Sequence, residues 1–387
     1  MASSDAGILL SLPFACIWLL IARIVSFIAP FFIVPSLMTA STFYKCIPFA
    51  KSIFSTEKQP RGFFMRIGFE ATYCMNVIRR YLTLPMRKRL PDVYILGFPK
   101  CGTTALATYL LRHQGVVGLD GLPWDATLSK ESHFFMGILG RDTTGSKRWY
   151  ASFFPTYIEL WWKEKVLKRA ERMLCLDACP LNACLPYTAE RIKQWTPDAK
   201  LIFMVRDPVD AMFSGEIMLR NAGVDLPWTL AEETETAKHP SLSVDAAAYF
   251  RKLEHLSMDE PLPEDLPHHV YYSAEAALYF STFADRVQPF LDRFPPKNIR
   301  FISLSEMSKD RVEDTVKSTL EFIGADTDSY TFTPWKMWSG ERKGRTVDPA
   351  FREQLNAYFE DSTARLEAMM QEVNANNNTQ PRSATAI

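Results

Sequence analysis

The fold is decided by the stretch Tyr94-Ile95-Leu96-Gly97-Phe98-Pro99-Lys100-Cys101-Gly102-Thr103-Thr104-Ala105. Its first three residues continue an apolar run from Val93 that predicts a buried strand, and a helical pattern follows from Thr104 to His113. The turn between the strand and the helix contains Gly97 and Gly102. Such a unit aims backbone N–H groups and the positive end of a helix dipole at one point. The stretch therefore predicts a phosphate-binding loop.

The position of the lysine in this turn separates two kinds of phosphate chemistry. Gly97 and Gly102 have the spacing of a Walker A loop, but Thr103 stands where that motif has its lysine, and Lys100 comes earlier. A kinase places that lysine on the β- and γ-phosphates. A lysine within the turn can instead reach the bridging oxygen next to a 5′-phosphate and neutralise the leaving group. This favours group transfer from a 5′-phosphate. A nucleotide kinase and a purely structural turn are the alternatives.

After Asp92 the chain alternates between apolar runs of strand length and helical patterns. The further apolar runs are Met173–Leu176, Lys200–Val205 and Ile299–Leu304, and further helices are expected near Ala189–Trp195, from Pro208 onward and over Asp310–Ile323. This alternation predicts an α/β, P-loop-like three-layer fold with a central, mostly parallel sheet covered by helices on both faces.

Composition divides the chain into four parts. We predict a membrane anchor in residues 1–42, a stem in 43–90, the α/β domain in 91–370 and a disordered polar tail in 371–387. The stem contains an amphipathic run, Phe63–Leu82, which can pack on the domain or lie on a membrane surface. Within the domain, Gly223–His269 is rich in Pro, Glu and Thr, which is typical of a surface insertion.

A second anion-binding position is expected where the run Lys200–Val205 ends. Arg206 follows it directly, and Ser214 lies two turns into the next helix. Strand ends in open α/β sheets line the ligand crevice, so Arg206 is well placed to bind a phosphate. The alternative is a structural ion pair between Arg206 and a nearby carboxylate.

Candidates for proton transfer lie in Lys130-Glu131-Ser132-His133-Phe134-Phe135. An attacking hydroxyl must lose its proton, and a carboxylate or imidazole within hydrogen-bond distance can accept it. Glu131 and His133 share a face if this segment is extended. Asp177, at the end of the second apolar run, is a candidate to orient Lys130 or to contact the acceptor. No metal is needed for this chemistry.

Together these motifs resemble the family of sulfotransferases that use 3′-phosphoadenosine 5′-phosphosulfate (PAPS), over about residues 91–365. The similarity is closest to heparan sulfate O-sulfotransferases and related Golgi carbohydrate sulfotransferases, which have a Lys-Glu-x-His-Phe-Phe segment and a late Lys-Gly-Arg loop. The resemblance implies that three groups of residues bind PAPS. They are Lys100, Cys101, Gly102, Thr103, Thr104 and Ala105 at the 5′-phosphosulfate, Arg206 and Ser214 at the 3′-phosphate, and Lys343, Gly344, Arg345 and Thr346 in a loop that closes over the nucleotide.

The resemblance also implies the reaction. Glu131 is expected to be the catalytic base with His133 supporting it, while Lys100 acts on the sulfuryl group during in-line transfer to a hydroxyl. PAPS would leave as adenosine 3′,5′-bisphosphate. The expected acceptor is a carbohydrate, and a lipid, sterol or small-molecule hydroxyl is the alternative.

The N-terminal segment predicts membrane attachment. From Gly7 to Ala40 the only charged residue is Arg23, and a span needs roughly 20 apolar residues. We expect residues 7–40 to anchor the chain, by one crossing or as a hairpin. Lys45 and Lys51 after the segment favour a cytosolic domain. The resemblance implies a single-pass type II Golgi membrane protein with a lumenal domain, which we prefer.

Net charge and cysteine content exclude several function classes. The 44 Lys and Arg balance the 44 Asp and Glu of this 387-residue chain, so no overall positive charge attracts nucleic acid, and any anion must be bound locally. The seven cysteines do not have the spacing of a zinc site, and no histidine is near Cys175–Cys184 in the sequence. We expect buried thiols in this cluster, with one disulfide as the alternative.

Overall fold

The centre of the molecule is a five-stranded sheet. This computed structural model describes seven residues between 17 and 25, and residues 76, 78–119, 130–135, 147–185, 187–221, 225–243, 273–328, 330–334 and 345–379. The strands are β1 (Val93–Gly97), β2 (Val116–Val117), β3 (Leu174–Asp177), β4 (Lys200–Val205) and β5 (Ile299–Ser303), in the spatial order β2-β3-β1-β4-β5. All four neighbouring pairs are parallel, so the predicted parallel sheet is confirmed.

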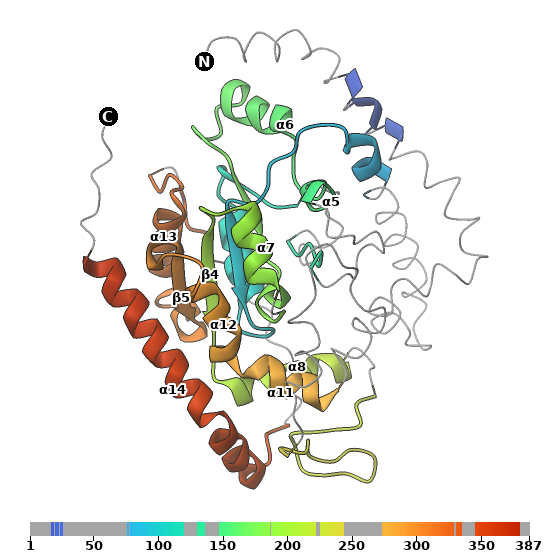
Figure 1. Cartoon of the computed structure of the whole chain (residues 1–387), viewed down its shortest axis with the longest axis vertical. Coiled ribbons are helices and arrows are strands. Elements are labelled where there is room, and N and C mark those ends of the chain that lie inside the picture. Colours follow the sequence, from blue (N-terminus) through green and yellow to red (C-terminus); the bar gives the residue numbers. More distant parts are fainter. Residues whose placement is uncertain are drawn as a thin grey trace, which may run out of the picture.

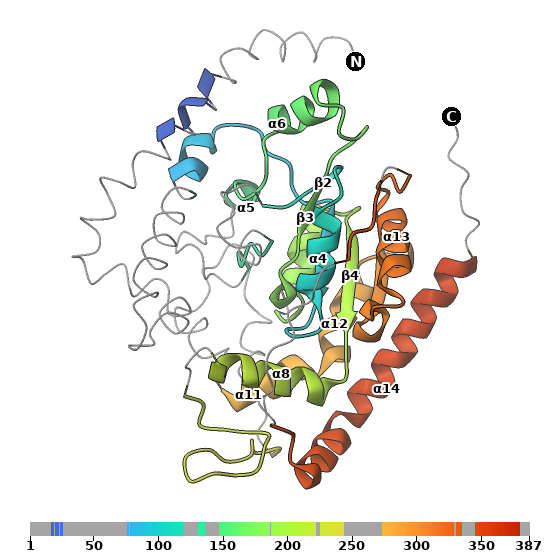
Figure 2. The same ribbon diagram turned by 180° about the vertical axis from the view of Figure 1, so that it is seen from behind.

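Helices cover both faces of this sheet. Figure 1 shows α7 (Thr188–Trp195) and α12 (Phe283–Leu291) over one face, and Figure 2 shows α4 (Thr103–Leu111) and α13 (Val312–Ile323) over the other. Within the described residues, the other α-helices of eight or more residues are α8 (Pro208–Asn221), α11 (Ala274–Ser281) and α14 (Pro349–Thr379). Because helices exclude water from both faces, every residue of β1 and β3 is buried.

Short elements complete the described part of the chain. They are α5 (Lys147–Ala151), α6 (Tyr157–Trp161), the π-helical turn η2 (Trp162–Val166), and the 3₁₀ turns η3 (Pro180–Ala183), η4 (Pro296–Asn298) and η5 (Leu304–Met307). The turn η5 follows β5 directly, and η3 follows β3 after two residues, so both lie at the carboxyl edge of the sheet.

The C-terminal helix corrects one predicted boundary. Residues 371–379, expected to be disordered, form the end of α14. Val373 there is buried, and the Nδ2 of Asn377 donates a hydrogen bond to the carbonyl of Ile299 at 3.2 Å. A helix needs only one contacting face, so the polar residues of this segment lie on its outer side. In Figure 1, α14 runs along one side of the domain.

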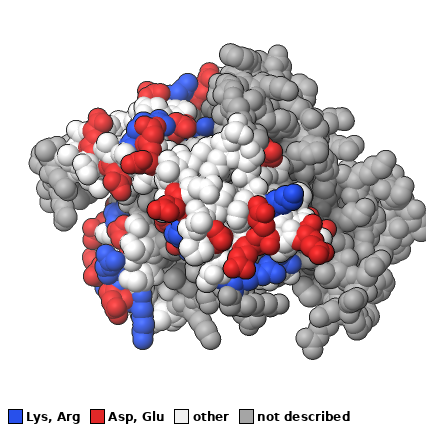
Figure 3. Space-filling view, turned by 90° about the horizontal axis from the view of Figure 1, so that it is seen from below, with Lys and Arg blue, Asp and Glu red and all other residues white. Residues whose placement is uncertain are grey.

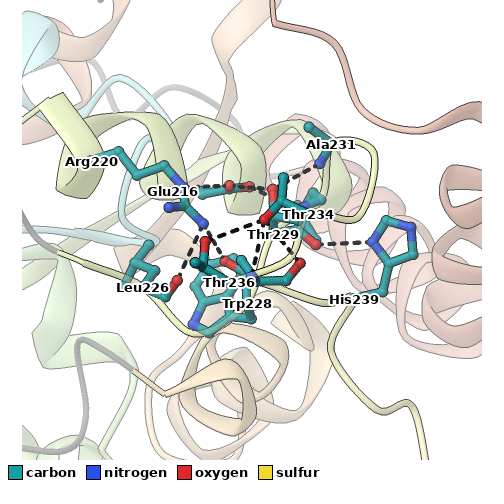
Figure 4. Close-up of polar contacts among 11 residues, drawn as sticks. Glu216, Arg220, Leu226, Trp228, Thr229, Ala231, Thr234, Thr236 and His239 are labelled. Carbon is teal, nitrogen blue, oxygen red and sulfur yellow. Dashed lines mark hydrogen bonds and ion pairs between the residues drawn. The ribbon is translucent and has the colours of Figure 1, made fainter.

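Part of the predicted surface insertion is buried. Residues 225–243 are described, and Trp228 and Leu230 within them have less than 5% of their surface exposed. The buried carboxylate of Glu216 on α8 accepts hydrogen bonds from the Thr229 hydroxyl at 2.7 Å and the Leu230 amide at 2.8 Å (Figure 4). The carbonyl of Leu230 accepts from Asp348 N at 2.8 Å. This loop therefore joins α8 to the start of α14.

The predicted membrane anchor and stem lie mostly outside the described residues. Among the residues that are described, no helix is long and apolar enough to cross a membrane. The indole N–H of Trp18 donates to the carbonyl of Leu82 at 2.8 Å, and residues 78–83 are helical. On the face shown in Figure 3, acidic and basic side chains are interspersed, in agreement with the balanced charge of the sequence.

Candidate active site

The loop after β1 has the backbone geometry of an anion-binding turn. Gly97, Lys100 and Gly102 have positive φ angles of 117°, 69° and 90°. Gly102 is the N-cap of α4, which begins at Thr103, and the first amides of a helix have no intrahelical acceptor. The predicted residues from Lys100 to Ala105 thus surround one helix N-terminus, where an anion is stabilised by N–H groups and by the helix dipole.

Glycine is required at position 97 because β4 lies against it. A Cβ atom at Gly97 would lie 2.6 Å from the carbonyl oxygen and 2.7 Å from the amide nitrogen of Met204. Such distances are far below van der Waals contact, so the loop can approach β4 only without a side chain here. The next residues of β4 and of the chain, Val205 and Arg206, consequently lie beside the loop.

Lys100 lies among other charged groups. The guanidinium of Arg206 donates to the carbonyl oxygen of Lys100 at 3.3 Å, and the ammonium of Lys100 contacts the sulfur of Met218 at 3.5 Å. Burial lowers the pKa of Lys100 and the positive charge of Arg206 lowers it further, against the opposing effect of Glu131. The two predicted phosphate-binding cations are therefore neighbours, and each would be stabilised by an anion bound between them.

Arg206 shares a carboxylate with a residue of the C-terminal helix. Its guanidinium lies 3.7 Å from Asp210, which also pairs with Arg352 of α14, and Arg352 lies 3.9 Å from Asp207. The alternative for Arg206, a structural ion pair with a nearby carboxylate, is thus present. This pair is long, however, and Asp210 lies closer to Arg352 than to Arg206. No local pattern singles out Arg352 as a partner of this site, since it lies 142 residues from Asp210.

The remaining predicted nucleotide-binding residues are less well placed. Ser214 is half-buried on α8, and the next residue, Gly215, faces the Lys100 side chain, with 3.9 Å between its added Cβ and the Cγ of Lys100. Lys343 and Gly344 lie outside the described residues. Arg345 and Thr346 are exposed, and within the described part of the chain they make no hydrogen bond to the Gly97–Gly102 loop. Cys101 is buried, so only its backbone can contact a ligand.

Glu131 is held between two cationic side chains. Its carboxylate pairs with the buried ammonium of Lys130, and its other oxygen lies 3.1 Å from Nε2 of His133. Lys130 also donates to the carbonyl of Ala178 at 3.2 Å. Burial would raise the pKa of Glu131, but Lys130 and His133 outweigh it and lower the pKa to about 2. Glu131 is therefore ionised and hydrogen-bonded before any substrate arrives.

His133 reaches Glu131 by a turn and not by an extended chain. Its φ angle is +47°, so the segment does not have the extended geometry that would place both side chains on one face, yet the two side chains are in contact. The other ring nitrogen, Nδ1, lies 3.7 Å from the sulfur of Cys179. Burial would lower the pKa of His133, but Cys179 and Glu131 outweigh it and raise the pKa to about 10.

Cys179 brings the cysteine cluster into contact with a histidine, His133, that is distant from it in the sequence. The described cysteines of the cluster, Cys175, Cys179 and Cys184, are free and buried, as expected for structural thiols. Donor atoms of Glu131, His133 and Cys179 lie within 4.8 Å of one another, so these residues could be considered as metal ligands. However, Glu131 and Cys179 contact opposite nitrogens of the imidazole. This fits a hydrogen-bonded row better than three ligands of one ion.

Asp177 was a candidate to orient Lys130, but its carboxylate contacts Ser132 instead. Its carboxylate accepts hydrogen bonds from the Ser132 hydroxyl and the Tyr150 hydroxyl, both at 2.7 Å, and from Asn182 at 3.3 Å. Asp177 is the last residue of β3. These contacts hold Ser132, and with it Glu131 and His133 on either side, at the carboxyl edge of the sheet. Ser132, Tyr150 and Cys179 were not predicted, since nothing in the sequence relates them.

The site combines a loop for a phosphate, cations beside it and an ionised carboxylate near those cations. The sulfotransferase domain model matches residues 90–345, which is more than half of the chain. The chain belongs to the sulfotransferase family. The sulfotransferase interpretation is thereby confirmed, and the nucleotide-kinase alternative loses its support.

Several individual sulfotransferases are similar to this chain. It is 28% identical over 130 residues to human heparan sulfate glucosamine 3-O-sulfotransferase 6, covering 34% of this chain and 31% of the relative. It is 23% identical over 237 residues to mouse heparan sulfate glucosamine 3-O-sulfotransferase 3A1, covering 61% and 46%. It is 29% identical over 125 residues to the membrane-associated sulfotransferase kil1 of Dictyostelium discoideum, covering 32% and 22%. This sulfotransferase thus spans less than half the length of each of these relatives.

Solved sulfotransferases also align with this structure. The alignment with a sulfotransferase from Alicyclobacillus acidocaldarius has a TM-score of 0.44 and 22% sequence identity, and covers 73% of this chain and 96% of that chain.

Proposed function

We propose that this sulfotransferase transfers the sulfuryl group of PAPS to a carbohydrate hydroxyl. The observation that carries the proposal is a hydrogen bond between the residues that follow strands β1 and β4. The carbonyl of Lys100, in the loop after β1, accepts a hydrogen bond from Arg206, which follows β4. Asp177, the last residue of β3, holds Ser132 and with it the neighbouring Glu131 at the same edge. Two cations for the phosphates of the donor and one base for the acceptor therefore share one edge of the sheet.

Each group has a separate role in the proposed transfer. The amides of Gly102, Thr103 and Thr104 bind the 5′-phosphate, while the amide of Ala105 already donates to the carbonyl of Gly102 at 3.0 Å. Arg206 with Ser214 binds the 3′-phosphate. Glu131 accepts the acceptor's proton as the acceptor oxygen bonds to sulfur and the bond from sulfur to the bridging phosphate oxygen breaks. Lys100 stabilises the charge left on the 5′-phosphate, so that adenosine 3′,5′-bisphosphate leaves. None of these steps uses a metal.

Ligand binding tests the donor. We expect adenosine 3′,5′-bisphosphate to raise the melting temperature of the full chain, and we expect ATP with Mg²⁺ to raise it less. A mass-action stabilisation of about 2.7 kcal/mol is expected at a ligand concentration 100 times Kd. Adenosine 5′-monophosphate is the matched control, because it lacks the 3′-phosphate assigned to Arg206. A preference for ATP with Mg²⁺ would contradict the proposed donor.

The carbohydrate acceptor is proposed from the Glu131 and His133 pair and from the names of the heparan sulfate relatives. Incubation of the full chain with labelled PAPS and a panel of glycans, sterols and phenols tests it directly. We expect label in the glycans, and label confined to sterols or phenols would replace the carbohydrate by that acceptor class.

We further propose that residues 7–40 anchor the protein in the Golgi membrane with the catalytic domain in the lumen. The apolar N-terminal sequence supports the anchor, and one relative is named as membrane-associated. Protease protection of intact microsomes tests the orientation. Digestion of the domain without detergent would place it on the cytosolic side.

A further inference from the structure

The helix formed by α6 and η2 presents apolar side chains to solvent. Tyr157, Trp161, Trp162, Val166 and Leu167 are all exposed, Trp162 by 49%. We call Tyr157–Arg169 the α6 face. Among the described residues, every other exposed large apolar side chain except Met218 lies between residues 17 and 25 or at Tyr81. Exposed apolar surface is therefore concentrated in few places, which is the usual sign of an interaction surface.

Few side chains of this helix are buried against the domain. Leu160 is the only buried residue of α6, and η2 has none. The helix is nevertheless well formed, because Thr156 and Glu159 make a reciprocal capping box at its start. An ordinary surface helix turns its apolar side chains toward the core. Here the larger apolar side chains point outward, so packing against the described part of the chain does not explain them.

Basic side chains are interleaved with the apolar ones. Lys165, Lys168 and Arg169 are exposed on the α6 face. Two nearby acids are engaged with the protein itself: Glu159 pairs with Arg79 at 3.3 Å, and Glu164 accepts from the amide of Met173 at 2.7 Å. The outward charge of the face is consequently positive. Exposed tryptophan and tyrosine beside lysine and arginine are typical of the membrane–water interface, where the cations reach the headgroup phosphates.

The α6 face lies at the same end of the molecule as the described residues between 17 and 25. Arg79 joins Glu159 of α6 to the helical residues 78–83, and Trp18 is hydrogen-bonded to Leu82 of that helix. Figures 1 and 2 show the described residues between 17 and 25, in blue, and α6 at the end of the molecule opposite α8 and α11. A bilayer that holds the N-terminal segment would therefore be within reach of the α6 face.

We propose that the α6 face docks on the phospholipid headgroup region of the membrane that residues 7–40 anchor. Trp161 and Trp162 enter the interface, while Lys165 and Lys168 contact headgroup phosphates. The catalytic domain is thus attached to the membrane at a second point. The proposal rests on the proposed membrane anchor and is independent of the proposed sulfuryl transfer.

Tryptophan fluorescence of the full chain in phospholipid vesicles tests the docking. Brominated lipids quench tryptophans that enter the bilayer interface. We expect the double variant Trp161→Phe and Trp162→Phe to lose quenched signal contributed by two of the nine tryptophans. Trp149→Phe is the matched control, because Trp149 is buried, and it should leave the quenched signal unchanged. Raising the salt concentration should reduce quenching in the parent chain, because it screens Lys165 and Lys168.

The outcomes separate the two membrane proposals. If the chain does not remain with the vesicles after an alkaline carbonate wash, both the anchor and the docking are wrong. If it remains but the double variant keeps the full quenched signal, the anchor stands and the docking is wrong. If the double variant instead lowers the molar mass in detergent, the α6 face binds a second copy of the chain, which also overturns the docking.

Discussion

At the scale of single residues, the state of Glu131 before catalysis is the most informative feature. An efficient general base has a pKa near the operating pH, whereas the contacts with Lys130 and His133 hold the pKa of Glu131 at about 2. A donor bound at Lys100 and Arg206 would bring negative charge close to this carboxylate. Like charges raise the pKa of a carboxylate, so donor binding would make Glu131 more basic when the acceptor arrives.

Replacing Glu131 tests its assigned role. We expect Glu131→Gln to lower kcat by at least about 100-fold, the usual contribution of a general base. The affinity for adenosine 3′,5′-bisphosphate should be retained or improved, because a negative charge near an anionic ligand is removed. The measurements are turnover with labelled PAPS and calorimetric binding. Glu321→Gln, at an exposed carboxylate of α13, is the control. Near-normal turnover in Glu131→Gln would show that the base lies elsewhere.

The same substitution should change the pKa of His133. In the parent chain this pKa is raised from 6.5 to about 10, so the stability contributed by protonated His133 is fully present below pH 6.5 and lost as the pH rises toward 10. In Glu131→Gln the pKa should fall, and unfolding free energy should decline less over that pH range. NMR titration of the imidazole measures the pKa directly. An unchanged value would mean that Glu131 does not stabilise the imidazolium.

At the scale of elements, the junction of β1 with β4 decides whether the phosphate loop forms. We expect Gly97→Ala to destabilise the protein by about 3 kcal/mol, because a positive φ and a clash with Met204 act together. Gly324→Ala is the matched control. Gly324 also has a positive φ, 76°, but nothing lies within 4 Å of an added Cβ, so about 1 kcal/mol is expected. Urea unfolding measures both, and equal losses would rule out the close approach as the cause.

The link between α8 and α14 gives a second prediction at this scale. Arg352→Ala should weaken binding of adenosine 3′,5′-bisphosphate two- to fivefold, or about 0.4–1 kcal/mol, because Asp210 would then pair more closely with Arg206. Arg206→Ala should weaken it by more than about tenfold. Adding Asp210→Asn to Arg352→Ala should restore affinity. An affinity that stays low in this double variant would show that Arg352 acts in another way.

The sequence predicted elements well where a local pattern fixed them. The run Lys200–Val205 is strand β4 with the same bounds, since a buried parallel strand is continuously apolar. Pro289 lies inside α12 and argues against a helix there, so this element could not be predicted. The contact of His133 with Cys179 joins residues 46 positions apart, and only the tertiary structure brings them together.

At the scale of the whole molecule, α14 supports one side of the domain by packing against it along most of its length. At 31 residues it is about 46 Å long, and its buried side chains include Phe351, Leu355, Phe359, Leu366 and Val373. The domain was predicted to end at residue 370, but α14 continues to Thr379. The prediction was wrong because Val373 is a single apolar residue in a polar sequence. The spacing of the earlier ones, by contrast, is a visible helical pattern.

Truncation of a side chain near the end of α14 tests this support. Val373→Ala should lower the unfolding free energy by about 1.5 kcal/mol, because two buried methyl groups are removed. Glu372→Ala, at an exposed position of the same turn, is the control and should change stability by less than about 0.5 kcal/mol. If both variants are as stable as the parent chain, the end of α14 does not contribute to folding.

The pairing of β1 with β4 also determines when the loop after β1 can form during protein synthesis. These neighbouring strands are separated by more than one hundred residues of chain, and Gly97 is placed by Met204. A ribosome making this protein must therefore release β4 before the loop after β1 can adopt its final shape. Pairings this distant in sequence form slowly, because a long loop must close first. The growing chain therefore becomes able to bind the donor late in synthesis, although the residues of the loop after β1 leave the ribosome early.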